Sequence, residues 1–155
     1  MIDQYERKLN EFIRRHGVAA EHLHFDVSCH SVADAARAVG ADAADFVKNI
    51  CMIGNNGRVI VAVVKGEDRV SAERVASVRS IPRPRLAVAP EILERTGYPC
   101  GGTPSFGFDA TFLVDARVME REVVYSGGGS AQSLVKIATK ELVRVNAGII
   151  AHIRT

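Results

Sequence analysis

The fold is decided by the stretch Val47-Lys48-Asn49-Ile50-Cys51-Met52-Ile53-Gly54-Asn55-Asn56-Gly57-Arg58-Val59-Ile60-Val61-Ala62-Val63-Val64. Its two ends, 47–53 and 58–64, are rich in the β-branched residues that strands favour. The Gly-Asn-Asn-Gly segment between them readily supplies the positive φ angles of a hairpin connection, because Asn and Gly tolerate that region best. The stretch therefore predicts a β-hairpin.

Helices and further strands are expected on both sides of this hairpin. Ser, Thr or Pro at a helix start and Gly at a helix end are the usual boundary signals. These signals and the apolar spacing predict helices at 3–16, 31–40, 71–79, 90–97 and 139–145. Ser31, Ser71 and Thr139 are the expected N-terminal caps of three of them. Short β-rich runs predict strands at 85–89, 111–115, 123–126, 134–137 and 149–153.

The order of these elements lacks the regular alternation of strand and helix that builds a doubly wound sheet. We therefore expect an α/β fold with a mixed β-sheet, curved or barrel-like, and helices packed outside it. The chain has 155 residues, of which 47% are hydrophobic, so it is long enough for one compact core and too short for two ordinary domains. No linker or repeat divides it, and residues 1–155 are expected to form a single domain.

Charge and composition bound the class of protein. A net charge of +2 gives no large field that would by itself indicate a nucleic-acid-binding protein, so any RNA contact should be local. The charged first residues, and the absence of an apolar run near the ~20 residues that span a bilayer, predict a soluble, cytoplasmic protein with no membrane partner. The three cysteines are widely spaced and odd in number, which indicates reduced thiols.

Lys48 is the first candidate for chemistry. Period two places it on the same face of its strand as Ile50 and Met52, and a lysine on an apolar face is unusual. Such a lysine can project into a pocket and hold a phosphate or a carbonyl group. The alternative is a strand-end lysine whose stem packs while its ammonium reaches water.

Two glycine-rich segments are candidate ligand-binding loops. In Gly101-Gly102-Thr103-Pro104-Ser105-Phe106-Gly107, the glycines let backbone amides approach a ligand closely while the proline limits flexibility, as an oxyanion hole requires. Ser126-Gly127-Gly128-Gly129-Ser130 connects two expected strands and could cradle a charged group with its amides. An ordinary surface turn and a flexible hairpin connection are the alternatives.

Cys29-His30, preceded by His22 and His24, raises the hypothesis of a metal site or a thiol enzyme. The chain has neither a CxxC pair nor an HExxH helix, so we expect no metal and no cofactor. Ser31 is better explained as a helix cap than as a nucleophile.

The one notable concentration of positive charge is arginine-rich and surrounds Ile81-Pro82. It could meet RNA phosphates, or its arginines could pair with nearby acids. The arginines are Arg69, Arg74, Arg79, Arg83 and Arg85, and the acids are Glu67, Asp68 and Glu73.

A series of motifs follows a specific order and spacing along the chain. They are Ser31–Ala36, Phe46-Val47-Lys48, Val63–Val70, Thr96–Gly107, Phe112–Asp115, Tyr125-Ser126-Gly127-Gly128 and Leu134–Leu142. Together they resemble the YbaK/ProX family of aminoacyl-tRNA deacylases, over roughly residues 20–145. One departure is visible, since many relatives carry proline where Ser105 stands.

This resemblance implies a domain like the editing insertion of bacterial prolyl-tRNA synthetases. It implies that this freestanding domain acts in trans to deacylate mischarged tRNA, with tRNA(Pro) carrying Ala or Cys as the first candidate substrate. It implies Lys48, Gly101 and Gly102 as the catalytic residues, with Gly127-Gly128 facing them across the cleft. The residues expected to contact the substrate are His30, Phe46, Thr103, Pro104, Ser105, Phe106, Gly107, Ser126, Gly127 and Gly128.

The expected partner is the 3′ acceptor end of aminoacyl-tRNA, with an aminoacyl-tRNA synthetase as a further candidate, for a monomer or a homodimer. No strong nucleophile is required, because an aminoacyl ester is reactive enough to be cleaved by positioned water or the neighbouring ribose hydroxyl while amides stabilise the oxyanion. The main rival is a non-catalytic module that binds a nucleotide, an aminoacyl-adenylate-like ligand or a partner protein. A thiol-dependent enzyme using Cys29 or Cys100 is the third hypothesis.

Overall fold

The computed structural model describes residues 2–29 and 31–155. The helices of this part of the chain are α1 (Gln4–Arg15), α2 (Val32–Val39), α3 (Ala72–Arg79), α4 (Ala89–Thr96) and α5 (Thr139–Asn146). Its strands are β1 (Ala20–His24), β2 (Val47–Ile53), β3 (Val59–Lys65), β4 (Arg85–Leu86), β5 (Thr111–Asp115), β6 (Val123–Gly127), β7 (Ser133–Ala138) and β8 (Ile149–Ala151). Short 3-10 turns at Ala43–Asp45 and Ala116–Glu120 complete the fold.

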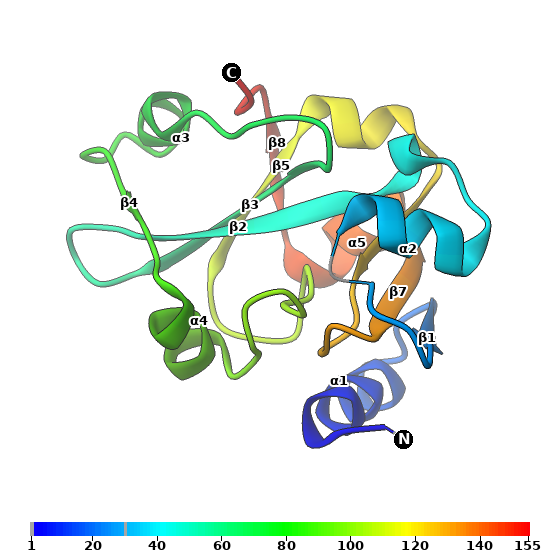
Figure 1. Cartoon of the computed structure of the whole chain (residues 1–155). Coiled ribbons are helices and arrows are strands. Elements are labelled where there is room, and N and C mark those ends of the chain that lie inside the picture. Colours follow the sequence, from blue (N-terminus) through cyan, green and yellow to red (C-terminus); the bar gives the residue numbers. More distant parts are fainter. Residues whose placement is uncertain (1, 30) are drawn as a thin grey trace.

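The strands form two sheets. The larger has the order β4-β2-β3-β5-β8, in which β2 pairs antiparallel with β3 and with β4, while β3-β5 and β5-β8 are parallel. The smaller is antiparallel, in the order β1-β7-β6. Figure 1 shows the β2–β3 hairpin crossing the middle of the molecule, with α1 and β7 towards one end and α3 and β4 towards the other. The expected mixed α/β fold is confirmed, and its sheets do not close into a barrel.

Local signals fixed most helix ends. Ser31 and Ser71 accept hydrogen bonds from backbone amides of α2 and α3, as capping residues do, and Gly97 ends α4 in the left-handed conformation. The expected cap at Thr139 was wrong. Ala138 occupies the cap position, and the Thr139 hydroxyl instead donates to the Arg121 carbonyl oxygen at 2.7 Å, so tertiary contact takes the place of a local cap.

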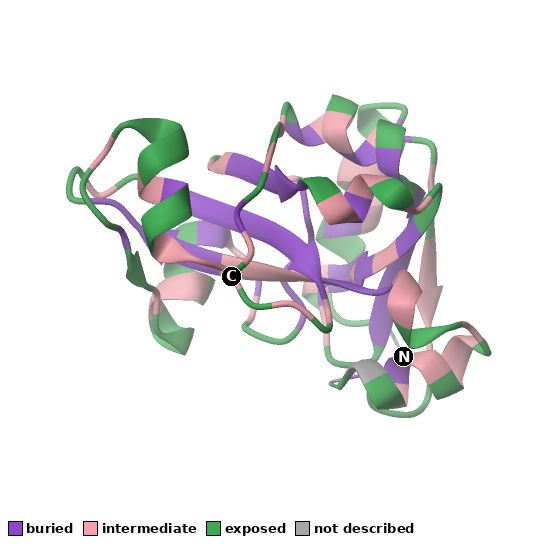
Figure 2. Ribbon diagram, turned by 90° about the horizontal axis from the view of Figure 1, so that it is seen from above, coloured by how far each residue is buried: buried purple, intermediate pink, exposed green. Residues whose placement is uncertain are grey.

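Two hydrophobic clusters cover opposite faces of the larger sheet. Val47, Cys51 and Ile53 of β2 join the cluster that packs towards α1 and the smaller sheet. Met52 joins the cluster on the other face, which includes Val75 of α3. Figure 2 shows the strands buried at the centre and exposed surface on the helices around them. Successive residues of β2 therefore face different clusters, and this alternation sets which of its polar residues reach the cavity described next.

None of the helices in the described part of the chain is both long enough and apolar enough to span a membrane.

Candidate functional site

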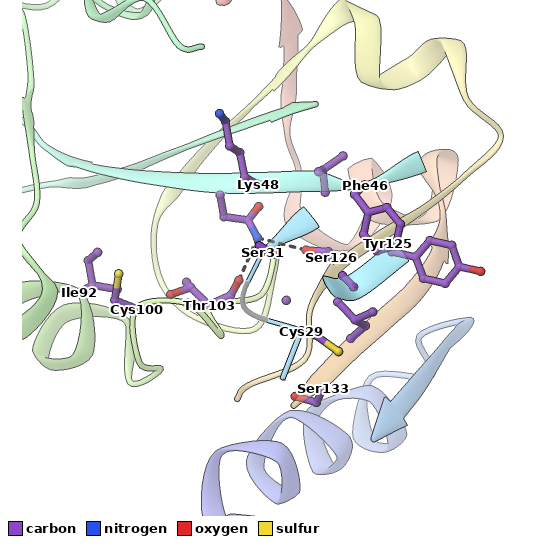
Figure 3. Close-up of a pocket in the computed structure, with 16 residues that line it drawn as sticks. Cys29, Ser31, Phe46, Lys48, Ile92, Cys100, Thr103, Tyr125, Ser126 and Ser133 are labelled. Carbon is purple, nitrogen blue, oxygen red and sulfur yellow. Dashed lines mark hydrogen bonds between the residues drawn. The ribbon is translucent and has the colours of Figure 1, made fainter. Parts of the chain in front are cut away.

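A cavity of about 210 Å³ lies where the two sheets meet. Phe46, just before β2, forms a parallel bridge with Tyr125 of β6, and their rings stack with centroids 5.0 Å apart. β2, the loop that follows α4, and the ends of β6 and β7 form the walls (Figure 3). The lining residues are Cys29, Ser31, Ala35, Phe46, Val47, Lys48, Asn49, Ile92, Cys100, Gly101, Thr103, Tyr125, Ser126, Gly127, Ser133 and Leu134.

Asn49 of β2 is hydrogen-bonded to two other walls of the cavity, the loop that follows α4 and strand β6. Its side-chain amide donates to the Thr103 carbonyl oxygen at 2.9 Å and to Ser126 Oγ at 3.1 Å. Its Oδ1 accepts from Ser105 Oγ at 2.6 Å, and Ser105 Oγ lies 2.6 Å from Ser126 Oγ. Because Ser105 donates its single hydroxyl proton to Asn49 Oδ1, Ser126 must be the donor in the hydrogen bond between the two serine hydroxyls. The network fixes the glycine-proline loop against β2 and β6.

Lys48 lies next to Asn49 but points the other way. Figure 3 shows its side chain leaving β2 on the side away from Thr103 and Ser126, as expected when the neighbouring Asn49 faces those residues. Lys48 is among the residues that line the cavity and is half-buried. Within the described residues, its ammonium makes no ion pair and no hydrogen bond, so it is a cation available to an anionic ligand.

Close backbone approach explains why the two loops carry glycine. A Cβ on Gly127 would lie 2.2 Å from the Thr103 carbonyl oxygen, and one on Gly102 would lie 2.6 Å from the Ser130 nitrogen. Gly129 N donates to the Gly102 carbonyl oxygen at 2.8 Å, which joins the two turns directly. No side chain larger than hydrogen fits between these main chains without displacing one of them.

Two backbone donors in this loop remain available. In the described part of the chain, the N–H groups of Gly101 and Thr103 donate to no protein acceptor, although both residues line the cavity. The Gly102 N–H differs, because it donates to the Pro99 carbonyl oxygen at 3.0 Å and closes the turn. Backbone N–H groups without a protein acceptor at a cavity wall are the kind of donor from which an oxyanion hole is built.

The structure separates the predicted site residues into those at the cavity and those behind it. The predicted residues at the cavity are Phe46, Lys48, Gly101, Thr103, Ser126 and Gly127. Those outside its lining are Gly102, Pro104, Ser105, Phe106, Gly107 and Gly128. Phe106 is fully buried in the core, where its ring lies 5.8 Å from that of Phe12. The prediction for His30 falls outside the described residues.

Sequence reasoning missed Asn49, Tyr125 and Ser133, all of which line the cavity. The signal for Asn49 was present, because the alternation that puts Lys48 with Ile50 and Met52 puts Asn49 on the opposite face. Tyr125 stood in the Tyr125-Ser126-Gly127-Gly128 motif but was not predicted to contact the substrate. For Ser133 the sequence held no signal, since its position depends on how the smaller sheet meets β2.

The cavity wall offers little acid–base chemistry. Among its described lining residues there is no carboxylate and no imidazole. Burial raises the pKa of the Cys29 thiol, and the nearby Asp34 carboxylate raises it further, which disfavours the nucleophilic thiolate. Across residues 2–29 and 31–155, no group of three or more His, Cys, Asp or Glu side chains could hold a metal ion.

The arginine cluster is only partly neutralised. Arg83 pairs with Glu73 at 2.8 Å, as one alternative expected, and Arg85 pairs with Glu91 at 2.6 Å. Glu67 and Asp68 pair instead with Arg117. The Arg83–Glu73 pair is exposed on both sides, and exposed pairs contribute little to stability.

The fold and the site define a class: a mixed α/β domain whose cavity is walled by close-packed glycine turns and hydrogen-bonded hydroxyls. The chain belongs to the aminoacyl-tRNA editing domain family, whose model matches residues 26–145, and this confirms the resemblance drawn from its motifs. The matched range contains every described lining residue of the cavity. Membership supports a role as an aminoacyl-tRNA deacylase.

Solved structures share the fold over nearly the whole chain. One is a hypothetical protein with 30% identity and a TM-score of 0.87, covering 96% of this chain and 99% of its own. Another has the proposed role of trans-editing for prolyl-tRNA synthetase, with 23% identity, a TM-score of 0.92 and coverage of 100% and 99%. A proposed signal-transduction protein from Marinobacter aquaeolei has 14% identity and a TM-score of 0.65, and the match covers 97% of this chain and 30% of that one. No curated protein matches the chain.

Proposed function

We propose that this protein is a trans-editing hydrolase that cleaves the ester between an amino acid and the 3′ end of mischarged tRNA, with Ala-tRNA(Pro) and Cys-tRNA(Pro) as the first candidate substrates. The observation that carries the proposal is that the cavity lies entirely within the segment matched by the aminoacyl-tRNA editing family. A synthetase that delivers the tRNA is a further candidate partner.

Backbone donors and positioning account for the chemistry. Water, positioned by the neighbouring ribose hydroxyl, attacks the ester carbonyl carbon, and the bond from that carbon to the ribose oxygen breaks. The proton that the water loses passes to the ribose oxygen, which leaves the free amino acid and deacylated tRNA. The N–H groups of Gly101 and Thr103 stabilise the negative charge that develops on the carbonyl oxygen. One such donor is worth roughly 10²–10³ in turnover. This route needs no carboxylate or imidazole on the cavity wall.

Size limits what the cavity admits. Its volume of about 210 Å³ is below the roughly 300–1,000 Å³ of ordinary small-molecule sites. It therefore suits the aminoacyl group and the ester, with the terminal adenosine resting at the mouth. Ile92, Tyr125 and Leu134 belong to the apolar part of the wall, which would select small side chains.

Lys48 serves as an anchor at the mouth in this proposal. A lysine ammonium is a compact, mobile point charge that suits a phosphate. Because its side chain leaves β2 on the side away from Thr103 and Ser126, we assign it to the phosphate of the terminal nucleotide and the carbonyl to the amides. Gly102 acts through packing of the turn.

The test is deacylation of a panel of mischarged tRNAs by the wild-type protein, Lys48→Ala and a matched control, Lys140→Ala. Lys140 is exposed on α5 and does not line the cavity. We expect release of Ala or Cys from tRNA(Pro) by the wild type and the control, and a loss of at least about 10-fold in kcat/KM for Lys48→Ala. A folded Lys48→Ala protein with full activity would refute the role given to Lys48.

A second candidate is a non-catalytic module that uses this cavity for a nucleotide, an aminoacyl-adenylate-like ligand or a partner protein. The cavity wall favours it in one respect, because its described residues offer no acid–base pair. The same panel separates the two, since folded wild-type protein that binds mischarged tRNA without releasing any amino acid supports the binding module.

A further inference from the structure

A buried carboxylate lies behind the glycine turn of the cavity. Glu6, in the first turn of α1, is only 1% exposed. Its Oε1 lies 2.8 Å from His24 Nδ1 and 3.7 Å from His22 Nε2, and its Oε2 accepts from Ser130 Oγ at 3.0 Å. Glutamate is almost never fully buried unless it is paired, so these contacts are what allow Glu6 to lie there.

Both sets of contacts lead from Glu6 to the wall of the cavity. Ser130 Oγ lies 2.9 Å from the Oγ of Ser133, and Ser133 lines the cavity (Figure 3). On the other side, His22 Nε2 lies 2.8 Å from the Gly128 carbonyl oxygen and must be the donor, because a carbonyl only accepts. Glu6 and its partners therefore hold the Gly128–Ser133 turn at two points.

The first turn of α1 also packs directly on this turn. A Cβ on Gly129 would lie 3.0 Å from the Tyr5 carbonyl carbon and 3.1 Å from the Glu6 nitrogen. On its other side, Gly129 donates to the Gly102 carbonyl oxygen at 2.8 Å. Three layers of main chain are thus in contact: the start of α1, the Gly128–Ser133 turn, and the loop that carries Gly101 and Thr103.

We infer that Glu6 is a positioning residue for the site, which holds the Gly128–Ser133 turn, and through it the amides of Gly101 and Thr103, in the geometry that deacylation requires. This inference deepens the proposed function and rests on it. The family model begins at residue 26, so Glu6, His22 and His24 lie outside the matched segment and add a support to the site from α1 and β1.

Glu6 also has a local role in α1. With Asp3 it forms a capping box, in which Glu6 N donates to Asp3 Oδ1 at 2.8 Å and Asp3 N lies 3.4 Å from Glu6 Oε2. The contact between Asp3 N and the Glu6 carboxylate is longer than the contacts of that carboxylate with His24 and Ser130. A helix cap also does not by itself require a buried carboxylate. Ser130→Ala distinguishes the two roles, because it removes the hydrogen bond between the turn and Glu6 and leaves the capping box intact.

The experiment compares Ser130→Ala and Glu6→Gln with the wild type, using Glu11→Gln as a matched control. Glu11 is an exposed residue of the same helix that pairs with Arg14 and Arg15. We would measure kcat and KM on the mischarged tRNA that the wild type cleaves best, the backbone amide NMR signals of Gly101 and Gly127, and the melting temperature.

We expect Ser130→Ala and Glu6→Gln to lower kcat by about 10-fold to 100-fold with little change in KM, because misplacing catalytic groups by about 1 Å costs turnover of that order. The amide signals of Gly101 and Gly127 should move in both variants and stay in place in Glu11→Gln. A change in stability alone would move the melting temperature without this pattern.

Ser130→Ala with wild-type kcat and unmoved Gly101 and Gly127 signals overturns the inference. If Glu6→Gln fails to fold, Ser130→Ala decides alone. If the wild type cleaves no tRNA in the panel, the proposed function fails, and the amide signals still decide whether Glu6 positions the turn.

Discussion

Gly102→Ala is the sharpest test of how the cavity is built. A Cβ at this position would lie 2.6 Å from the Ser130 nitrogen, 2.7 Å from the Gly129 carbonyl carbon and 2.8 Å from the Ser130 Cα. All three atoms belong to the main chain, so no side-chain rotation can relieve the contact. The loop carrying Gly101 and Thr103 must therefore move away from the Gly127–Ser130 turn.

The size of the movement follows from these distances. Non-bonded heavy atoms reach their best contact at about 3.5–4.0 Å, so the two turns must separate by roughly 0.9 Å or more. Overpacking of this kind costs about 1–3 kcal/mol of stability. The separation would also move the two amides by a similar distance, and a displacement of about 1 Å at a catalytic site costs about 100-fold in rate.

The assay pairs deacylation kinetics with thermal unfolding, and Gly17→Ala is the control. Gly17 has a φ of +58° with nothing within 4 Å of the added Cβ, so the substitution costs about 1 kcal/mol through backbone strain and leaves the cavity alone. We expect both variants to lose stability and only Gly102→Ala to lose turnover. Wild-type kcat in a folded Gly102→Ala protein would refute the reasoning.

Two further predictions concern buried polar groups. Asn49→Ala removes the partner of the Thr103 carbonyl oxygen and one of the two partners of Ser105 Oγ. It should cost about 1–3 kcal/mol of unfolding free energy, measured in urea, together with a loss of kcat. For Asp115, burial raises the pKa, but hydrogen bonds from the Ile153, Arg117 and Arg154 amides and from the Arg154 guanidinium outweigh it, so the pKa lies below its ordinary value of 3.8. Because the pKa is lowered by folding, the Asp115 carboxylate contributes stability that is fully present above pH 3.8 and is lost as the pH falls through the folded pKa. Asp115→Asn should therefore destabilise the protein at neutral pH. The difference in unfolding free energy between the variant and the wild type should shrink in urea titrations repeated at progressively lower pH below 3.8. A deficit that stays constant with pH would contradict this assignment.

The elements that could be predicted from the sequence are those with local causes. The Gly-Asn-Asn-Gly turn between two β-branched runs has one favourable arrangement, and it became the β2–β3 hairpin. Ser31 and Ser71 cap their helices through contacts within one turn. β1 had no such signal, because Ala20–His24 carries a single large aliphatic residue and owes its strand conformation to pairing with β7.

The same distinction applies to the candidate site. Motifs identified the two glycine segments, because main-chain contact such as that between Gly127 and Thr103 leaves no room for a Cβ and so restricts the residue type. They could not identify Glu6, whose burial depends on a turn 124 residues away in the chain. Long-range polar pairs leave no periodic pattern in a sequence, since either partner alone looks like an ordinary surface residue.

Lys48 and Asn49 are consecutive residues of β2 whose side chains leave the strand on opposite sides. Alternation along β2 places Asn49 on the inner wall, where it is hydrogen-bonded to Thr103 and Ser126, and directs Lys48 to the opposite side of the strand, where we assign the mouth. In the proposed function, this arrangement suits a substrate with a neutral reacting ester and a charged backbone next to it. A cation inside the cavity would have to lose its water, whereas at the mouth it keeps its hydration until a phosphate replaces it. The inner wall is then left to neutral hydrogen-bond donors, which act on charge only as it develops on the carbonyl oxygen.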